Sequence, residues 1–150
     1  MLASILLFLE ANPGSYATSE VRPPGYEWAG KYAGYLELAP PFAINNCHLL
    51  ARELSGSGTD LDNLATCSRQ ANTYSKGEGR LEDNMRKYEV QVKDAIDDGQ
   101  VVRYQVTPKY SGSRTVPASF EMSAVGSYGD GSPGIRFDEV VPNSLWVPKT

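Results

Sequence analysis

The chain has 150 residues, a formal net charge of -4 at pH 7 and a mean hydropathy of -0.38. This length suits one domain that folds without stabilising disulfides or metal ions. No segment approaches the roughly 20 apolar residues needed to cross a bilayer, so no membrane-spanning helix is predicted. With a pI near 5.0, the surface as a whole is unsuited to polyanions, and binding them requires basic residues gathered in one cleft. The basic residues that most closely follow the single histidine are interleaved with acids and are Arg52, Arg69, Lys76, Arg80, Arg86 and Lys87.

The first third of the chain contains few strong structural signals. Residues 1–10 hold a short apolar run without a basic segment or a small-residue cleavage site, which favours a strand or helix over a signal peptide. An arbitrary start, cut from a longer polypeptide, is a further alternative. Residues 11–34 are rich in proline, glycine and tyrosine and predict an irregular, packed lead-in. The segment Tyr35-Leu36-Glu37-Leu38 predicts a short strand, which the following prolines end.

The single histidine, His48, lies in the run Asn45-Asn46-Cys47-His48 and precedes a loop with glycines at 56 and 58. No Gly-Lys-Ser/Thr follows these glycines, so they are not a phosphate-binding P-loop, and we interpret them as a flexible turn. The residues expected to form the apolar wall around this loop are Leu49, Leu50 and Leu54.

The chain has two cysteines, Cys47 beside His48 and Cys67 before Asn72. A disulfide between them would tie the two halves of this region together, and a secreted protein would be expected to form it. Two buried thiols are the alternative. One histidine and two cysteines leave a four-ligand zinc set incomplete, which argues against a structural zinc site.

The strongest local prediction is a helix that begins near Gly79 and ends at Gly99, a plausible C′ stop. Glu89 follows Tyr88 by about 100° around the helix axis, so we expect it at the margin of the buried stripe. The apolar residues that recur at spacings of three and four are Leu81, Met85, Tyr88, Val92, Ala95 and Ile96.

Beyond the helix the apolar residues alternate with polar ones, which is typical of strands with one buried face. The alternating apolar residues are Val102, Tyr104 and Val106, and then Phe120, Met122 and Ala124. These two strands are expected to be antiparallel neighbours, and a third is predicted around 135–141. The fold class is therefore α+β, with one long helix packed against an antiparallel sheet.

Several of these residues suit the hydrolysis of a phosphodiester. This reaction needs a base to activate water, positive charge at the phosphate and help for the departing 3′ oxygen. His48 can accept a proton at neutral pH and is the candidate base. Mg²⁺ suits the other two roles and takes only one or two ligands from the protein, so no cluster of aspartates is required.

The order of His48, the glycine-rich loop, Asn63, Asn72 and Glu89 resembles the DNA/RNA non-specific endonucleases, whose fold is a ββα-metal (His-metal) finger. The likeness extends over residues 34–143. The resemblance implies that His48 is the catalytic base and that Asn72 holds Mg²⁺, or Mn²⁺ as a substitute. It also implies that Glu89 belongs to the catalytic and metal site by ordering the metal's water shell, and that Asn63 supports the site by fixing the loop.

Each of these residues also has an ordinary structural interpretation. Asparagines before helices, such as Asn72, are commonly caps or turn residues, and Asn63 after a glycine loop is good turn chemistry in any protein. The alternative for Glu89 is an exposed ion pair with Lys93, four residues further along the helix. We divide the chain into a lead-in at 1–33, part of the same unit, and a nuclease domain at 34–150.

The residues before His48 differ from the pattern Asp-Arg-Gly-His that many members of this family carry. Amides replace the acid that supports the site and the arginine that contacts phosphate, and an amide binds phosphate less strongly than a charged bidentate donor. The side chains that remain as candidates for phosphate contact are Asn46, Arg52, Arg69 and Arg80. Members with Cys-His-Leu at this place resemble bacterial secreted and toxin-associated domains.

Together these features predict a metal-dependent endonuclease that cleaves DNA, with RNA as a second candidate substrate. The resemblance implies secretion or delivery into a target cell, and a cognate inhibitor (immunity) protein as a partner. The competing hypothesis is a degenerate nuclease-fold module that binds nucleic acid or a protein without cleavage, which the loss of the Asp-Arg pair favours. A small extracellular structural domain, favoured by the cysteine pair, is a third alternative.

Overall fold

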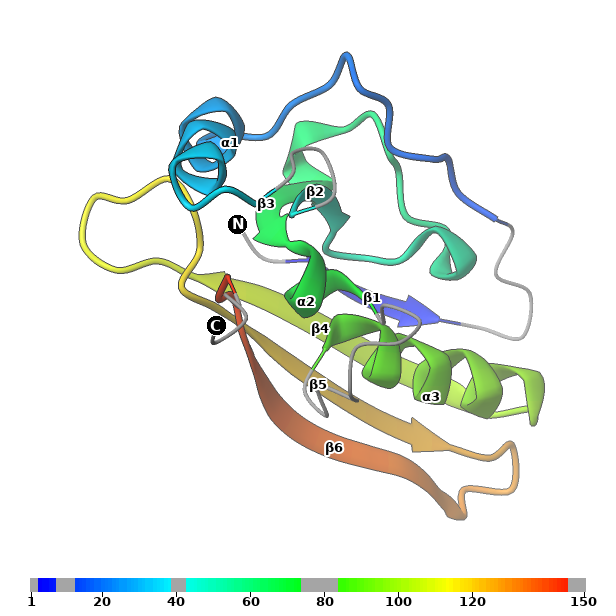
Figure 1. Ribbon diagram of the computed structural model, residues 1–150. Helices are drawn as coiled ribbons and strands as arrows, with labels where there is room; N and C mark the ends of the chain where they lie inside the picture. The colour runs from blue at the N-terminus through cyan, green and yellow to red at the C-terminus, as the bar shows by residue number, and fades with distance from the viewer. Residues whose placement is uncertain (1–2, 8–12, 39–42, 74–83, 146–150) are drawn as a thin grey trace.

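A computed structural model describes residues 3–7, 13–38, 43–73 and 84–145 (Figure 1). In chain order the elements are β1 (Ala3–Leu7), α1 (Tyr26–Tyr35), β2 (Ile44–His48), η1 (Arg52–Leu54), η2 (Leu61–Asn63), β3 (Leu64–Ser68), α2 (Arg69–Asn72), α3 (Met85–Asp97), β4 (Val101–Lys109), β5 (Ser119–Ser127) and β6 (Pro133–Pro142). The strands form one antiparallel sheet in the order β1-β4-β5-β6 and a separate antiparallel ribbon of β2 and β3. The predicted α+β architecture is confirmed.

The large sheet has one buried face and one exposed face, as the alternating sequence predicts. On β4 and β5, Val102, Tyr104, Phe120 and Met122 are almost completely buried, whereas Val125 on the opposite face is exposed. The predicted pairing of these two strands and the third strand, β6, are both confirmed. The apolar run near the N-terminus supplies β1, which pairs with β4 and extends the sheet by one strand.

Helix α3 lies across the buried face of this sheet (Figure 1). Its buried residues include Val92 and Ile96, and each such side chain contributes roughly 1.5–3 kcal/mol by leaving water. The helix begins later than predicted, because Asn84 has an extended backbone and caps the helix by accepting a hydrogen bond from the Lys87 N–H. Gly79 and Leu81 lie outside the described residues. At the other end, Gly99 has a φ of 86° and directly follows the cap Asp98, as predicted.

Helix α1 contradicts the predicted irregular lead-in over residues 26–34 and the predicted strand at 35–38. Ala29 and Ala33 lie one turn apart and pack against Ile44 of β2, so tertiary packing stabilises a segment that its glycines disfavour as a helix. The helix ends in a Schellman motif. The Leu38 N–H donates to the Ala33 carbonyl, and Glu37 takes the left-handed conformation (φ 57°) that glycine usually occupies.

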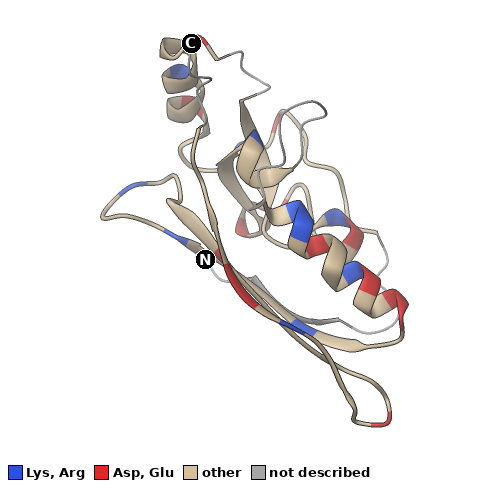
Figure 2. Cartoon of the chain, turned by 60° about the horizontal axis from the view of Figure 1, so that its bottom comes forward, with Lys and Arg blue, Asp and Glu red and all other residues tan. Residues whose placement is uncertain are grey.

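The β2–β3 ribbon packs onto the core that α3 and the large sheet share. Cys47 and Cys67 form a disulfide across it, with Cα atoms 5.9 Å apart. The short helix α2 leads from β3 toward α3 and contacts it. Figure 2 shows basic and acidic residues alternating along the exposed side of α3. Among the described residues, no helix is both long and apolar enough to cross a membrane.

Candidate active site

The β2–β3 ribbon has two faces, and the candidate residues are divided between them. Because side chains alternate along a strand, Asn45 and Cys47 project to the face that packs on the core, which we call the inner face. Ile44, Asn46 and His48 project to the opposite, outer face. This face is covered by α1 and by residues 14–24, which precede α1.

His48 is half-buried on the outer face, at the end of β2. Its Nε2 lies 2.9 Å from the backbone carbonyl oxygen of Ser15. A carbonyl can only accept a hydrogen bond, so in the neutral imidazole the proton must be on Nε2 and the lone pair on Nδ1. Within the described residues no hydrogen bond involves Nδ1, so this nitrogen is available to accept a proton from water.

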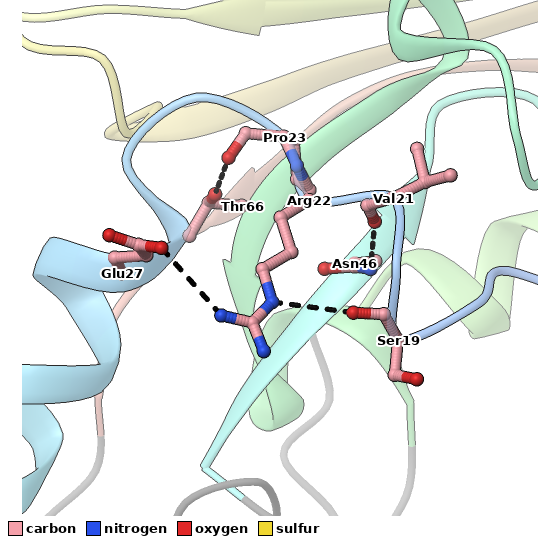
Figure 3. Close-up of polar contacts among 7 residues, drawn as sticks. All are labelled: Ser19, Val21, Arg22, Pro23, Glu27, Asn46 and Thr66. Carbon is pink, nitrogen blue, oxygen red and sulfur yellow. Dashed lines mark hydrogen bonds and ion pairs between the residues drawn. The ribbon is translucent and has the colours of Figure 1, made fainter.

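Asn46 also lies on the outer face, but its amide is directed at the lead-in rather than at a free surface. Its Nδ2 donates to the carbonyl oxygen of Thr18 at 3.1 Å. It also donates to the carbonyl oxygen of Val21 at 2.6 Å (Figure 3). Its Oδ1 is buried and has no hydrogen-bond partner in the described part of the chain. Both donor hydrogens of Asn46 are therefore engaged by backbone carbonyls in this structure, and its contact with phosphate stays a prediction.

Asn63 fixes the loop between β2 and β3. Its Oδ1 accepts from the Leu50 N–H at 2.9 Å, and its Nδ2 donates to the Leu50 carbonyl at 3.0 Å and to the Ser57 carbonyl at 2.9 Å. The side chain thus mimics a strand partner for Leu50 while anchoring the glycine segment. Asn63 therefore holds the loop in place, and its amide is fully engaged with backbone groups.

The glycines of this loop are closely packed, which corrects the prediction of a flexible turn. A Cβ at Gly56 would collide with the Leu50 carbonyl, and one at Gly58 would collide with the backbone of Tyr16. Gly14 in turn approaches the Gly56 carbonyl so closely that it too has no room for a side chain. These glycines therefore permit close backbone approach rather than motion.

Asn72 ends α2 and contacts the inner face of the ribbon. Its Nδ2 donates to the Oδ1 of Asn45 at 3.2 Å, and the Nδ2 of Asn45 donates to the Ile44 carbonyl at 3.1 Å. Asn45 therefore acts as the acceptor that orients Asn72, a role a carboxylate at this position would also perform. No hydrogen bond reaches the Oδ1 of Asn72 within the described residues, so its carbonyl oxygen remains available as a ligand.

Glu89 lies in the second turn of α3 and is only 8% exposed, more deeply buried than the margin position predicted for it. Burial raises the pKa of its carboxyl to about 8, although the charge of Arg86 opposes this. Burial, and secondarily the charge of Glu89, also raise the pKa of Tyr104 on β4, whose hydroxyl has no partner among the described residues. The alternative pair with Lys93 does not form, because Lys93 binds Asp97.

A cavity of about 140 Å³ beside Glu89 is lined by both charged and apolar groups. On its rim, Arg86 forms an ion pair with Glu53 of η1, with the charged atoms 2.6 Å apart. Burial acts to raise the pKa of Glu53, but hydrogen bonds from its backbone and from Arg86 lower it overall. Arg86 is thus neutralised by Glu53, and Glu89 is left without an ion-pair partner in the described residues.

The donor groups on the inner face suit a hard cation. Asn72 offers an amide oxygen, and Glu89 offers a carboxylate that has no ion-pair partner among the described residues. Both are oxygen ligands of the kind that Mg²⁺ prefers. A nearby cation would lower the raised pKa of Glu89 and keep the carboxylate ionised. The described residues contain no cluster of three or more His, Cys, Asp or Glu side chains that could hold a metal ion.

The structure does not unite all the predicted residues in one contact network. Asn72 contacts Asn45 on the inner face, and α2 packs against the helix that carries Glu89. His48 lies on the opposite face and three residues further along β2 than Asn45, an offset of about 10 Å along the strand. Arg69 begins α2, at the end of the ribbon opposite to the end that carries His48. Arg80 lies outside the described residues.

Four contributions to this region have weak or no sequence signals. The Ser15 carbonyl is a backbone group that any residue could supply, and the Glu53–Arg86 pair links residues 33 positions apart. The sequence pattern around Tyr104 indicates only a buried residue of a strand. Asn143 joins the ribbon to the large sheet by binding the Ser68 N–H and the carbonyls of Thr66 and Pro117. The only feature of the sequence that draws attention to Asn143 is its position in the run Val141-Pro142-Asn143, at the end of a strand.

Comparison with known proteins gives a consistent result. Residues 26–126 match the family model of the DNA/RNA non-specific endonucleases. The structure of Sda1 nuclease with a bound zinc ion is 29% identical, with a TM-score of 0.54, over 69% of this chain and 39% of that chain. The chain therefore spans well under half the length of that protein.

Two further solved structures share the fold. An extracellular nuclease is 22% identical with a TM-score of 0.57, over 69% of this chain and 68% of that one. An extracellular endonuclease is 20% identical with a TM-score of 0.58, over 97% of this chain and 80% of that one. No curated protein sequence matches the chain.

Proposed function

Because the chain belongs to the DNA/RNA non-specific endonuclease family, we propose that it is a metal-dependent nuclease that hydrolyses the phosphodiester bonds of DNA, with RNA as a second substrate. The observation that carries this proposal is the state of His48. It is the single imidazole of the chain, and its Nε2 is held by a backbone carbonyl while Nδ1 remains available as a base.

In the proposed reaction, Nδ1 of His48 accepts a proton from a water molecule as the water oxygen forms a bond to phosphorus. The bond from phosphorus to the 3′ oxygen breaks, and this oxygen leaves with the electron pair. A divalent cation at Asn72 would supply positive charge for the phosphate and for the departing oxygen. Asn45 orients Asn72, and Glu89 would steady the water shell of the cation from the adjacent helix.

Sequence-independent cleavage is expected from such a site. Contacts to phosphate and sugar position the substrate but carry no base information. We propose Mg²⁺ as the cation, with Mn²⁺ as a substitute, because the donors are oxygen atoms. The zinc ion bound in the Sda1 nuclease structure makes Zn²⁺ a necessary arm of any metal test.

Secretion or delivery into a target cell is part of this proposal. It is supported by the extracellular nucleases that share the fold and by the disulfide between Cys47 and Cys67, since disulfides persist in oxidising compartments. A cognate inhibitor protein would then protect the producing cell. Expression without such an inhibitor should reduce the viability of a bacterial host, and the His48→Ala variant should restore it.

The decisive experiment is degradation of plasmid DNA and total RNA by the purified chain. The arms are Mg²⁺, Mn²⁺ and Zn²⁺, each with and without EDTA, and His48→Ala under the same conditions. Cleavage that requires both a metal and His48 supports the proposal and ranks the substrates. Full activity in His48→Ala would overturn the assignment of the base.

A second candidate function is a nuclease-fold module that binds nucleic acid without cleaving it. Two observations favour it: Asn46 replaces an arginine and is engaged by the lead-in, and His48 lies on the face opposite Asn72. Binding of labelled DNA that persists in EDTA, with no cleavage under any metal, would support this candidate over the enzyme.

A further inference from the structure

The segment before α1 forms an extended covering over the outer face of the ribbon. We call residues 14–24 the N-terminal strap. Its backbone carbonyls accept hydrogen bonds from side chains of both ribbon strands. The Ser15 carbonyl accepts from His48, those of Thr18 and Val21 accept from Asn46, and those of Pro23 and Pro24 accept from Thr66. Figure 3 shows the Asn46–Val21 and Thr66–Pro23 bonds. The outer face of the ribbon therefore presents donors, and the strap presents a matching series of acceptors.

The end of the strap nearest His48 interlocks with the loop that follows β2. The Gly14 N–H donates to the Arg52 carbonyl at 2.8 Å, and the Ser15 N–H donates to the Gly56 carbonyl at 3.2 Å. In the reverse direction, the Gly58 N–H donates to Ser15 Oγ at 2.8 Å. Backbone and side chain of Ser15 are thus both fixed, so its carbonyl faces His48 from a determined position.

Close packing reinforces these hydrogen bonds. Gly14 lies against the Gly56 carbonyl and Gly58 against the Tyr16 backbone, with no room for a Cβ at either glycine. The Arg52 guanidinium lies 4.2 Å from the centre of the Tyr16 ring, which adds a cation–π contact between the loop and the strap. Any side chain at Gly14 would therefore displace the strap from the loop and move the Ser15 carbonyl.

We propose that the N-terminal strap is a positioning element for His48, in which the Ser15 carbonyl selects the Nε2–H tautomer and leaves Nδ1 as the base. The strap precedes residues 26–126, the region matched by the family model. The consequence for catalysis rests on the proposed nuclease function. The selection of the tautomer does not, and it can be measured whether or not the protein cleaves nucleic acid.

The test uses the full chain labelled with ¹⁵N. Because the chain has one histidine, its imidazole nitrogens give one unambiguous set of signals in a long-range ¹H–¹⁵N correlation spectrum at a pH where the ring is neutral. The variants are Gly14→Ala, which displaces the strap, and Ser15→Ala, which removes the Oγ acceptor but keeps the carbonyl. Gly129→Ala is the matched control, because a Cβ at Gly129 meets nothing within 4 Å.

We expect the wild type and Gly129→Ala to show protonated Nε2 and unprotonated Nδ1. Gly14→Ala should give a mixture of tautomers, and kcat should fall on the order of ten-fold or more with KM little changed. Ser15→Ala should lie between them and guards against a Gly14→Ala variant that fails to fold. Protonated Nδ1 in the wild type, or a tautomer unchanged in a folded Gly14→Ala variant, would overturn the proposal. If the tautomers are as expected but no nucleic acid is cleaved, the positioning role of the strap stands and the proposed nuclease function fails.

Discussion

The outer face of the β2–β3 ribbon is held by a continuous stretch of backbone, whereas the inner face is held by a disulfide and the protein core. On the outer face, His48 and Asn46 donate to carbonyls of the N-terminal strap. On the inner face, Cys47 and Cys67 are joined, and Asn45 binds Asn72. The candidate base and the candidate metal ligand therefore depend on different parts of the chain, and variants should affect them separately.

The largest expected effect is on the outer face. Replacing His48 with alanine removes the base, and cleavage of plasmid DNA should fall by roughly 10²–10⁴-fold. The side chain is half-buried and makes one hydrogen bond within the described part of the chain, so the melting temperature should change little. Metal affinity, measured by calorimetry, should also remain close to that of the wild type. A matching loss of metal affinity in His48→Ala would show that the two faces are not independent.

The disulfide tests the inner face. It closes a loop with a sequence separation of 20, and a cross-link of this span contributes about 3 kcal/mol by restricting the unfolded chain. The double variant Cys47→Ser/Cys67→Ser should therefore unfold at a clearly lower urea concentration than the wild type. Urea titration followed by circular dichroism measures this. An unchanged midpoint in the double variant, or no effect of a reductant on the wild type, would contradict the expected contribution.

Parts of this fold are evident in the sequence because their signals are local. β4 and β5 alternate apolar and polar residues over one buried and one exposed face, and Gly99 ends α3 with a positive φ. Helix α1 gives no such signal, since Gly30 and Gly34 weaken its helix propensity and packing on Ile44 provides the stability. The glycine loop shows a related limit, because the same residue type permits either motion or close packing.

The candidate site is evident in its residue types but not in its arrangement. The order of His48, Asn63, Asn72 and Glu89 is readable in the chain, yet their distribution over two faces depends on strand alternation and on where the lead-in packs. The burial of Glu89 depends on η1, which lies far from it in sequence, and on β4, the strand that follows its helix. The Ser15 carbonyl is a backbone group, and no residue pattern could have indicated it.

Glu89 predicts a pH dependence that arises on the inner face. Burial raises its pKa from 4.5 to about 8, so between these values the folded state binds more protons than the unfolded state. Stability of the metal-free protein should therefore fall as pH rises through this range, by on the order of 1 kcal/mol per pH unit. Urea unfolding in EDTA at pH 5.5, 6.5 and 7.5 measures the slope.

Glu89→Gln is the control for this pH dependence, because the amide does not titrate and should flatten the curve. Mg²⁺ should also flatten it, since a nearby cation favours the carboxylate. The His48→Ala variant should retain the slope of the wild type. An equal slope in Glu89→Gln would assign the pH dependence to other groups.

The sharpest separation of the two faces uses Asn45 and Asn46, which are identical in type and adjacent in sequence. Asn45→Ala removes the acceptor that orients Asn72 and should weaken metal binding roughly ten-fold, whereas Asn45→Asp keeps an acceptor and should bind as well as the wild type. Asn46→Ala removes two bonds to the strap and should lower kcat with metal affinity unchanged. Calorimetry with Mg²⁺ and kinetics on plasmid DNA distinguish the two effects. Equal losses of metal affinity in both alanine variants would mean that the ribbon responds as one unit, because a division by strand alternation requires neighbouring residues to behave differently.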